Sequence, residues 1–387
     1  MTLLVAGWVA IDEIETPFAR VEDSLGGSAT CAAMAAALFT DVRLLAAVGE
    51  DFPAHHRETL AAVSGLDLAG LTVEGPRTSR WGGRYHYDMN TRDTLYTELG
   101  VNAAWRPVLP AGWEDSTTAF LAAGDPLMQR TLIEGLPSAR ATMVDTIKFY
   151  IDGMPGELRE TMGAADFVTV NESEAREIAG TPSIAKAARA LLAGGPKGVI
   201  VKLGEYGAAF ASAEDYFVAP GYPLEDVVDP TGAGDAFAGG FLGYLDSVDV
   251  VTPGAIRRAI IYGSTVASFD VEGFGPSRLL TLTRAEVEAR YQEFRRLTHF
   301  EAGEEGWRNG RCGGRARRAR TSTTWCGGFP TATTSGRCCG RGWSTAHTRW
   351  GSSNRGCLSE RAGTGRGGTR DRGWCCTAAA GSGKRRS

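Results

Sequence analysis

Residues 229–241 read Asp-Pro-Thr-Gly-Ala-Gly-Asp-Ala-Phe-Ala-Gly-Gly-Phe, a glycine-containing turn followed by a helix-like apolar run. Glycines at positions 232 and 234 allow a tight turn that points successive N–H groups into one concavity. The concavity stands at the start of a helix, whose dipole also favours an anion. The stretch therefore predicts a site that can hold developing phosphoryl charge.

Asp235 closes this stretch and has two interpretations. Its carboxylate lies beside the predicted anion site, where it can act as a general base on a hydroxyl group. Asp is also a frequent helix cap. The stretch by itself leaves both interpretations open. If the φ angle of Gly234 is positive, a Cβ at that position obstructs the turn.

The rest of residues 1–302 alternates apolar strand-like runs with helix-periodic segments. This alternation is typical of an α/β fold in which helices cover both faces of a parallel sheet. The expected strands are 3–9, 42–48, 119–123, 143–145, 167–170 and 199–203, and the expected helices are 29–39, 54–63, 127–136, 173–179, 184–193, 234–245, 254–269 and 284–297.

Two stretches do not fit that rhythm. Residues 11–23 and 78–100 have the alternation of short β-strands that face partly to solvent. Together they predict a small accessory sheet. An edge hairpin of the main sheet is the alternative.

Four motifs in one order give a family resemblance. They are the 229–240 stretch, Gly26-Gly27 with the Ala-rich helix and Val48–Asp51 after it, Asn171-x-x-Glu174, and Lys202-x-Gly204-x-x-Gly207. Together they resemble the ribokinase-like, or PfkB-type, carbohydrate kinases over nearly all of residues 1 to about 300. The resemblance implies a three-layer α/β/α sandwich with a mostly parallel central sheet and a small β lid from about 11–23 and 78–100, within a kinase domain at 1–302.

The resemblance also implies roles at the phosphoryl site. Asp235 becomes the catalytic base, and Gly232, Ala233 and Gly234 supply the anion hole for the γ-phosphoryl group that ATP passes to an alcohol. Asn171 and Glu174 then belong to the magnesium and phosphate network, where Glu174 acts through water on Mg²⁺. The alternative for this pair is a helix N-cap with a first-turn acid.

Other residues are placed along the nucleotide by the same resemblance. They are Lys202, Gly204, Gly207, Thr231 and Gly273, of which Lys202 has the alternative of a solvated strand end. Some family members bind K⁺ near the residues that correspond to Asp229 and Thr231. Whether this chain does so stays open.

The resemblance assigns the substrate side to Asp12, Gly26 and Gly27. A carboxylate at Asp12 is a strong acceptor for hydroxyl groups. The chain departs from the family at Cys31, where an Asn is usual, because a thiol cannot replace the donors and acceptor of an amide. Asp125 is either a further substrate acid or a helix-starting turn.

The accessory sheet corresponds in position to the lid of the family, which covers the substrate and often pairs two subunits. Closing a lid excludes water that would otherwise take the phosphoryl group. Tyr85, Tyr87, Asn90 and Arg92 are candidates to face the substrate. An alternating strand, however, puts half of any such set on the wrong face.

Charge and cysteine content differ between the two parts of the chain. Residues 1–302 have 24 basic and 41 acidic residues, and residues 303–387 have 17 basic and 4 acidic ones. A body this acidic repels phosphate backbones, so nucleic acid is an unlikely ligand. Its single cysteine, its lack of an apolar run of about 18 residues and its lack of a basic leader favour a cytoplasmic protein without a membrane span.

Residues 303–387 are rich in Arg, Gly, Cys and Trp, and their only Leu, Ile, Val, Met or Phe are Phe329 and Leu358. Such a segment buries too little apolar surface to fold, so we expect a disordered tail. A nucleic-acid-binding arm and a zinc site compete with a third hypothesis, out-of-frame translation of a GC-rich gene, which the composition favours.

Taken together, the sequence predicts an ATP-dependent, Mg²⁺-requiring kinase that phosphorylates a hydroxyl of a small sugar, polyol or nucleoside. A nucleoside or inositol kinase is the nearest alternative. A non-catalytic ligand-binding relative is the alternative from another class, although the expected base and anion-hole glycines are all present.

Overall fold

The computed structural model describes residues 1–299, and their strands form two sheets. The larger sheet has ten strands in the order β14-β13-β12-β11-β10-β9-β1-β4-β5, with β6 also paired to β4. All its pairs are parallel except those of β13 with β12 and with β14. Its strands are β1 (Thr2–Ala6), β4 (Asp41–Val48), β5 (Leu66–Asp67), β6 (Leu71–Val73), β9 (Thr118–Leu121), β10 (Ala141–Val144), β11 (Phe167–Asn171), β12 (Gly198–Lys202), β13 (Ala208–Ser212) and β14 (Tyr216–Ala219).

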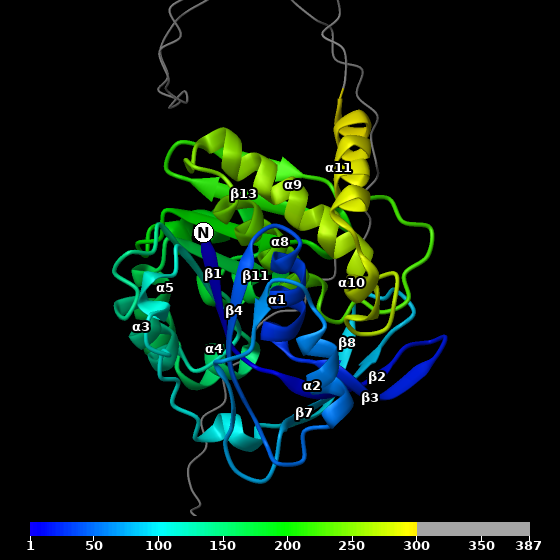
Figure 1. The fold of residues 1–387 in the computed structure, drawn as a ribbon. Coiled ribbons are helices and arrows are strands. Elements are labelled where there is room, and N and C mark those ends of the chain that lie inside the picture. The colour runs from blue at the N-terminus through cyan, green and yellow to red at the C-terminus, as the bar shows by residue number, and fades with distance from the viewer. Residues whose placement is uncertain (300–387) are drawn as a thin grey trace, which may run out of the picture. The chain divides into compact units, whose positions relative to one another are not determined.

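Helices cover both faces of this sheet, as the sequence predicts (Figure 1). One face carries α1 (Ser28–Ala37), α2 (Ala54–Ala61), α8 (Ala233–Asp246), α9 (Pro253–Asp270), α10 (Ser277–Thr281) and α11 (Arg284–Thr298). The other carries α3 (Pro126–Glu134), α4 (Lys148–Gly153), α5 (Pro155–Ala164), α6 (Glu172–Ala179) and α7 (Ile184–Leu192). Single turns of 3₁₀ helix lie at Gly100–Ala103 (η1), Trp113–Asp115 (η2) and Gly204–Tyr206 (η3). The mostly parallel three-layer sandwich is thereby confirmed.

Two separate cores follow from the period of two along each strand. In β1, Leu3 and Val5 pack into the first core, and Leu4 and Ala6 pack into the second. Successive side chains of a strand point to opposite faces, so a strand that is covered on both faces must be apolar throughout. The run in β1 meets this condition.

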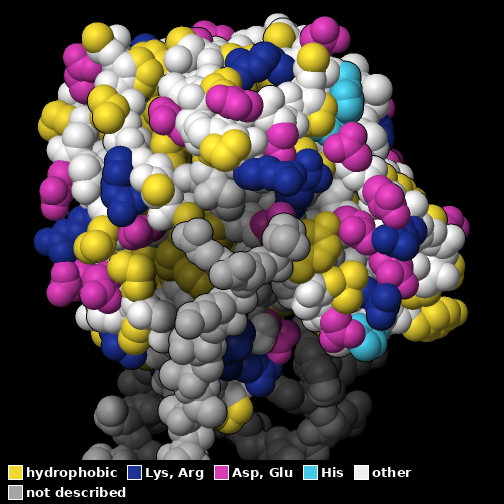
Figure 2. Space-filling view, turned by 90° about the horizontal axis from the view of Figure 1, so that it is seen from below, with side chains coloured by type: hydrophobic (Ala, Val, Ile, Leu, Met, Phe, Trp, Pro, Cys, Tyr) yellow, Lys and Arg dark blue, Asp and Glu magenta, His cyan; other side chains and the backbone are white. Residues whose placement is uncertain are grey.

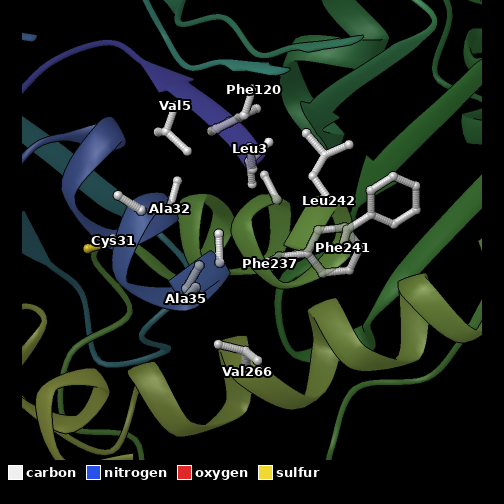
Figure 3. Packing of buried hydrophobic residues seen from close by; sticks show 14 of the residues in the cluster. Leu3, Val5, Cys31, Ala32, Ala35, Phe120, Phe237, Phe241, Leu242 and Val266 are labelled. Carbon is white, nitrogen blue, oxygen red and sulfur yellow. The ribbon is translucent and has the colours of Figure 1, made fainter. Parts of the chain in front are cut away.

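Helices α1 and α8 pack unusually close in the first core, because their facing residues are small. A Cβ at Gly239 of α8 would lie 2.1 Å from the carbonyl oxygen of Ala32 in α1. Figure 3 shows Ala32 and Ala35 on α1 and Phe237 and Phe241 on the neighbouring α8. This close packing brings the N-termini of α1 and α8 to the same edge of the sheet.

A second sheet of four strands, in the order β3-β2-β7-β8, lies apart from the main one. It consists of β2 (Ala10–Glu15), β3 (Arg20–Gly26), β7 (Ser79–Tyr85) and β8 (Arg92–Glu98). Figure 1 shows these strands grouped at one side of the sandwich. The two β stretches predicted from alternation are therefore confirmed, and the alternative of an edge hairpin in the main sheet is wrong.

Some elements have no counterpart among the expected ones. The antiparallel strands β13 and β14 and the helices α4 and α5 lie where no element was assigned. The strand β13 reads Ala-Ala-Phe-Ala-Ser, whose Ala residues have weak strand propensity, so its pairing with β12 decides its conformation. Predictions for residues 303–387 lie outside the described part of the chain. Within residues 1–299, none of the helices combines the length and apolar character needed to span a bilayer.

Candidate active site

Three predicted site residues and one further acid, Asp145, gather where the carboxyl ends of the parallel strands meet. Asp145 follows β10, Asn171 ends β11, Lys202 ends β12, and Asp12 lies on β2 directly after β1. The strand β1 pairs with β4 on one side and with β9 on the other, so the connections leave this point in opposite directions. Such a topological switch point is where open α/β sheets bind ligands.

The turn before α8 has the geometry of an anion site. Gly232 is the N-cap residue in the left-handed conformation, with φ 88°. The N–H groups of Asp235 and Ala236 donate to its carbonyl oxygen, and that of Ala233 makes a long contact of 3.4 Å with the carbonyl oxygen of Pro230. Among the described residues, no partner accepts from the N–H of Gly232 or Gly234. Two of the three expected donors are thus unpaired.

The conditional prediction for Gly234 fails, because its φ is not positive and Gly232 is the residue that takes the left-handed conformation. The physical reason is that Gly234 already belongs to α8. Its small size still has a consequence, since a Cβ at Gly234 would lie 3.0 Å from Lys202 Nζ. The ammonium group of Lys202 therefore lies against the turn.

Asp235 stands in the first turn of α8, half-buried among other charged groups. Burial raises the pKa of Asp235 to about 8, with Asp145 adding to the rise and Lys202 opposing it. A carboxyl group with a pKa near neutrality is suited to accept a proton at physiological pH. The alternative of a cap does not describe it, because the N-cap residue is Gly232.

Lys202 and Asp145 form a buried ion pair beside this turn. Lys202 Nζ donates to Asp145 Oδ2 at 2.7 Å, and their side chains are 17% and 7% exposed. Burial by itself would lower the pKa of Lys202, but the carboxylates of Asp145, Asp235 and Glu174 outweigh it and raise that pKa. Lys202 is therefore not a solvated strand end.

Asp145 is a site residue that was not predicted from the sequence. Its position directly after a buried strand is the signal that identifies it, since carboxyl ends of neighbouring parallel strands converge. Its Oδ1 accepts from the N–H of Thr146, which orients the carboxylate toward Lys202.

Asn171 and Glu174 form a reciprocal capping box at the start of α6. Asn171 Oδ1 accepts from the N–H of Glu174 at 2.9 Å, and Glu174 Oε2 accepts from the N–H of Asn171 at 2.9 Å. The alternative of an N-cap with a first-turn acid thus describes the local geometry. Burial raises the pKa of Glu174 to about 7, and Asp145 adds to the rise while Lys202 opposes it. Glu174 therefore belongs to the same charged cluster as Asp235.

On the substrate side, Asp12 is 6% exposed and packs against the Gly26-Gly27 turn. A Cβ at Gly26 would lie 2.0 Å from Asp12 Oδ2, and Gly27 is the N-cap residue of α1 with φ 92°. Burial raises the pKa of Asp12 to about 7, against the opposing N–H of Gly27. The turn thus holds a carboxylate near the N-terminus of α1.

Cys31 lies directly behind the anion turn. A Cβ at Gly232 would lie 2.6 Å from Cys31 Sγ and 3.3 Å from Asp270 Oδ2. Burial raises the pKa of the Cys31 thiol, and Asp270, Asp235 and other nearby carboxylates raise it further, so the thiol is neutral. The departure from the family at Cys31 therefore lies against the anion turn.

Asp229 connects two loops behind the turn. Its Oδ1 accepts from the N–H of Thr231, and its Oδ2 accepts from the N–H of Gly275. The neighbouring Asp270 is fully buried, and neither of its carboxylate oxygens has a partner within residues 1–299. Burial raises the pKa of Asp229 and, well above its ordinary value, that of Asp270.

The three glycines expected along the nucleotide occupy tight places. Cβ atoms would lie 2.6 Å from Asn90 Oδ1 at Gly204, 2.2 Å from the Ala219 carbonyl oxygen at Gly207, and 2.6 Å from Ser277 Oγ at Gly273. Packing within the protein therefore accounts for small residues at all three positions.

The lid sheet touches this region through two side chains. Thr231 Oγ1 donates to the hydroxyl of Tyr85 at 3.0 Å, and Asn90 Nδ2 donates to Glu205 Oε1 at 3.1 Å. Arg92 packs over the Trp81 ring. Its positive charge opposes the rise in the pKa of Asp12, Asp235 and Glu174, but burial has the larger effect on all three. Tyr87, in contrast, is 83% exposed. The four residues expected to face the substrate therefore do not all lie on one side of the lid.

Asp125 is the N-cap residue of α3, where its Oδ1 accepts from the N–H of Leu127 at 2.9 Å. It also lines a cavity together with Trp8 and Trp105. The helix-starting interpretation of Asp125 thus describes its local geometry.

Comparison with known proteins identifies the family. Residues 11–281 match the model of the pfkB family of carbohydrate kinases. The chain belongs to this family. Its members are phosphotransferases with hydroxyl acceptors, so the chain is a kinase that binds ATP.

Relatives of this kinase carry several substrate names. A cytidine kinase of Thermococcus kodakarensis is 34% identical over 249 residues, which are 62% of this chain and 87% of that protein. A ribokinase of Arabidopsis thaliana is 27% identical over 247 residues, 59% of this chain and 64% of that protein.

Solved structures agree in fold. A nucleoside kinase of Methanocaldococcus jannaschii, described as an archaeal member of the ribokinase family, has a TM-score of 0.62 at 20% identity, covering 76% of this chain and 98% of that one. A fructokinase of Vibrio cholerae, bound to fructose, ADP and calcium, has a TM-score of 0.63 at 20% identity, covering 74% and 98%.

Proposed function

We propose that this kinase phosphorylates a hydroxyl on the sugar of a nucleoside, with Asp235 as the base. The proposal rests on one observation: Asp235 and the unpaired N–H groups of Gly232 and Gly234 lie together at the start of α8. The choice of a nucleoside rests on the 34% identity to a cytidine kinase over most of that protein.

The reaction is an in-line transfer of the γ-phosphoryl group of ATP. Asp235 takes the proton from the acceptor hydroxyl as its oxygen bonds to the γ-phosphorus, while the bond to the β,γ-bridging oxygen breaks and ADP leaves. The N–H groups of Gly232 and Gly234 hold the charge that develops on the phosphoryl oxygens. Lys202 adds positive charge beside them.

Asp12 and the Gly26-Gly27 turn orient the acceptor sugar. An ionised carboxylate accepts hydrogen bonds from two sugar hydroxyls without needing a proton of its own. In this proposal Tyr85 and Asn90 keep the lid against the site, since each contacts a residue of the nucleotide side. The closed lid excludes water from the phosphoryl group.

The cluster of carboxylates suits a divalent cation. Glu174 and Asp145 offer the oxygen ligands that Mg²⁺ prefers, and both already accept internal hydrogen bonds, which fits coordination through water. Bound Mg²⁺ neutralises charge on the phosphates of ATP. Asn171 fixes the position of Glu174 through the capping box.

A monovalent cation such as K⁺ also fits this part of the molecule. The carboxyl groups of Asp229 and of the unpartnered Asp270 lie directly behind the anion turn, where burial raises the pKa of both and so disfavours their negative charge. A cation held there by Asp229 and the backbone of Thr231 would offset that charge. Dialysis against K⁺-free buffer is then expected to lower thermal stability and to raise the KM for ATP.

Pairing of two subunits through the lid is a further part of the proposal. The strand β8 is an exposed edge, and Phe18 and Tyr87 form an exposed aromatic pair with ring centroids 6.1 Å apart. Exposed edges and apolar patches favour pairing with another copy. Nucleic acid is disfavoured as a partner, because Figure 2 shows acidic and basic side chains interspersed over the face that it draws.

The test is a substrate panel with ADP release as the readout. Nucleosides, ribose, fructose and inositol are compared at equal concentration with Mg-ATP. We expect kcat/KM to be highest for a nucleoside. Turnover of free sugars alone would leave the base and anion turn in place and overturn the choice of acceptor, whereas no substrate-dependent turnover would favour a ligand-binding relative.

A further inference from the structure

A cluster of two histidines and one aspartate lies between the lid sheet and the sandwich. Asp23 belongs to β3 of the lid sheet, and His55 and His56 lie in the first turn of α2. A ligand atom from each of the three side chains lies within 4.8 Å of the other two. None of these side chains is assigned to the phosphoryl site or to the substrate side, so the cluster is a separate feature.

A β-bulge directs Asp23 toward α2. The pairing of β2 with β3 shifts its register between Asp12 and Ile14, where two residues of β3, Glu22 and Asp23, lie opposite one residue of β2. Asp23 has φ 60°. Such a bulge turns a side chain away from the regular alternation of the strand. The bulge thus accounts for a carboxylate of the lid sheet that faces a helix of the sandwich.

The distances within the cluster suit a metal ion better than hydrogen bonds. Asp23 Oδ2 lies 3.8 Å from His55 Nε2, and Asp23 Oδ1 lies 3.8 Å from His56 Nε2. A hydrogen bond between such atoms is at most about 3.2 Å long. Two ligands that each lie about 2.1 Å from one tetrahedral Zn²⁺ are themselves about 3.4 Å apart. Small movements of the exposed side chains of Asp23 and His55 therefore complete this geometry.

His56 presents a buried nitrogen without a partner. Its side chain is 8% exposed, and no group among the described residues forms a hydrogen bond with its Nε2. Buried polar atoms without a partner are rare and costly in folded proteins. Because the carboxylate of Asp23 faces this nitrogen, an ion between them supplies the missing interaction.

The other two members of the cluster are open to solvent. The side chains of Asp23 and His55 are 51% and 63% exposed, so an ion reaches the cluster without unfolding of the chain. Water completes the coordination on this open side. Two imidazole nitrogens and one carboxylate oxygen are a donor set that suits Zn²⁺, whereas Mg²⁺ and Ca²⁺ prefer oxygen ligands throughout.

We propose that Asp23, His55 and His56 bind Zn²⁺ and that this ion joins the lid sheet to α2. The strand β3 ends at Gly26, in the turn against which Asp12 packs. An ion at the bulge therefore fixes the strand of the lid that leads to the substrate side. The site does not depend on which alcohol accepts the phosphoryl group.

Calorimetric titration of the full chain with Zn²⁺, without ATP or Mg²⁺, tests the site. Asp23→Asn removes the charge and introduces a residue that tolerates a positive φ, and His55→Gln removes an exposed imidazole. Glu22→Gln, which changes the neighbouring exposed carboxylate of β3, is the matched control. We expect the wild type and the control to bind one more Zn²⁺ per chain than either test variant. Equal zinc stoichiometry and affinity in the wild type and either test variant would overturn the site.

Other zinc ligands of the chain do not affect this comparison. The cysteines of residues 303–387 and the carboxylates of Asp145 and Glu174 are the same in all four proteins. Any Zn²⁺ that they bind contributes equally to each titration. The difference in stoichiometry therefore reports on the cluster of Asp23, His55 and His56.

Hydrogen exchange of backbone amides tests whether the ion joins the two elements. At a Zn²⁺ concentration about tenfold above Kd, exchange through openings that release the ion is expected to slow by about tenfold. We expect this protection in both β3 and α2 of the wild type, in neither element of Asp23→Asn, and not in α7. Protection confined to α2 would overturn the connection between the lid sheet and the helix.

Discussion

The phosphoryl end and the acceptor side of the site are built in different ways. At the phosphoryl end, the donors are backbone N–H groups within four consecutive residues, Gly232 to Asp235. At the acceptor side, Asp12 of β2 offers its side chain, which packs against the Gly26-Gly27 turn of a separate segment. A backbone donor persists when side chains change, so one family keeps its chemistry at the first end and can change its substrate at the second.

The largest expected effect tests the phosphoryl end. Asp235→Asn keeps the shape of the side chain and removes its basicity, so we expect kcat to fall by about 10² to 10⁴ with little change in ATP affinity. Steady-state kinetics and nucleotide titration measure both quantities. Asp249→Asn, at an exposed position beyond the other end of α8, is the matched control. Normal turnover in Asp235→Asn would mean that another group takes the proton.

Two glycine variants test whether the backbone conformation at Gly232 is what the anion turn requires. Gly232→Ala requires a left-handed φ of 88° and brings a Cβ against Cys31 Sγ. Gly234→Ala has an ordinary helical φ and meets only the flexible end of Lys202. We expect kcat/KM to fall about ten times further in Gly232→Ala than in Gly234→Ala. Equal losses in the two variants would contradict the assignment of the turn to Gly232.

The pH dependence of kcat/KM tests the electrostatics of the same end. Only the ionised form of Asp235 can accept a proton, and its pKa is raised to about 8. Activity should therefore rise with pH through this value, by about tenfold per unit on the acid side, and level off above it. The raised pKa values of Asp12 and Glu174, about 7, act in the same direction. A flat profile between pH 6 and 9 would contradict this account.

The smallest expected effect concerns residues 303–387. The family match ends at residue 281, so truncation after residue 302 is expected to leave kcat and KM unchanged. Activity assays of the full and shortened chains measure this directly. A loss of turnover on truncation would assign these residues a catalytic or substrate-binding part. Resequencing the end of the gene separately tests whether the reading frame continues unbroken.

The sequence was sufficient to predict a feature when all the residues that form it are close together in the chain. The turn at Gly232 to Asp235 and the strand runs of β1 and β12 depend on residues that are neighbours in the chain. The alternation in 78–100 likewise predicted β7 and β8, because strand periodicity is a local property. Asp145 was missed, since its importance comes from Lys202, which lies 57 residues away in sequence.

The sequence alone determined the α/β class, the family and the residues of the anion turn, because hydrophobic period and glycine placement act over a few residues. Only the tertiary structure decided that Gly232 and not Gly234 takes the left-handed φ, that Lys202 is buried against Asp145, and that Asp23 faces His55 and His56. Burial and pairing depend on which segments the fold brings together. The number of residues between two positions does not give the distance between them in space.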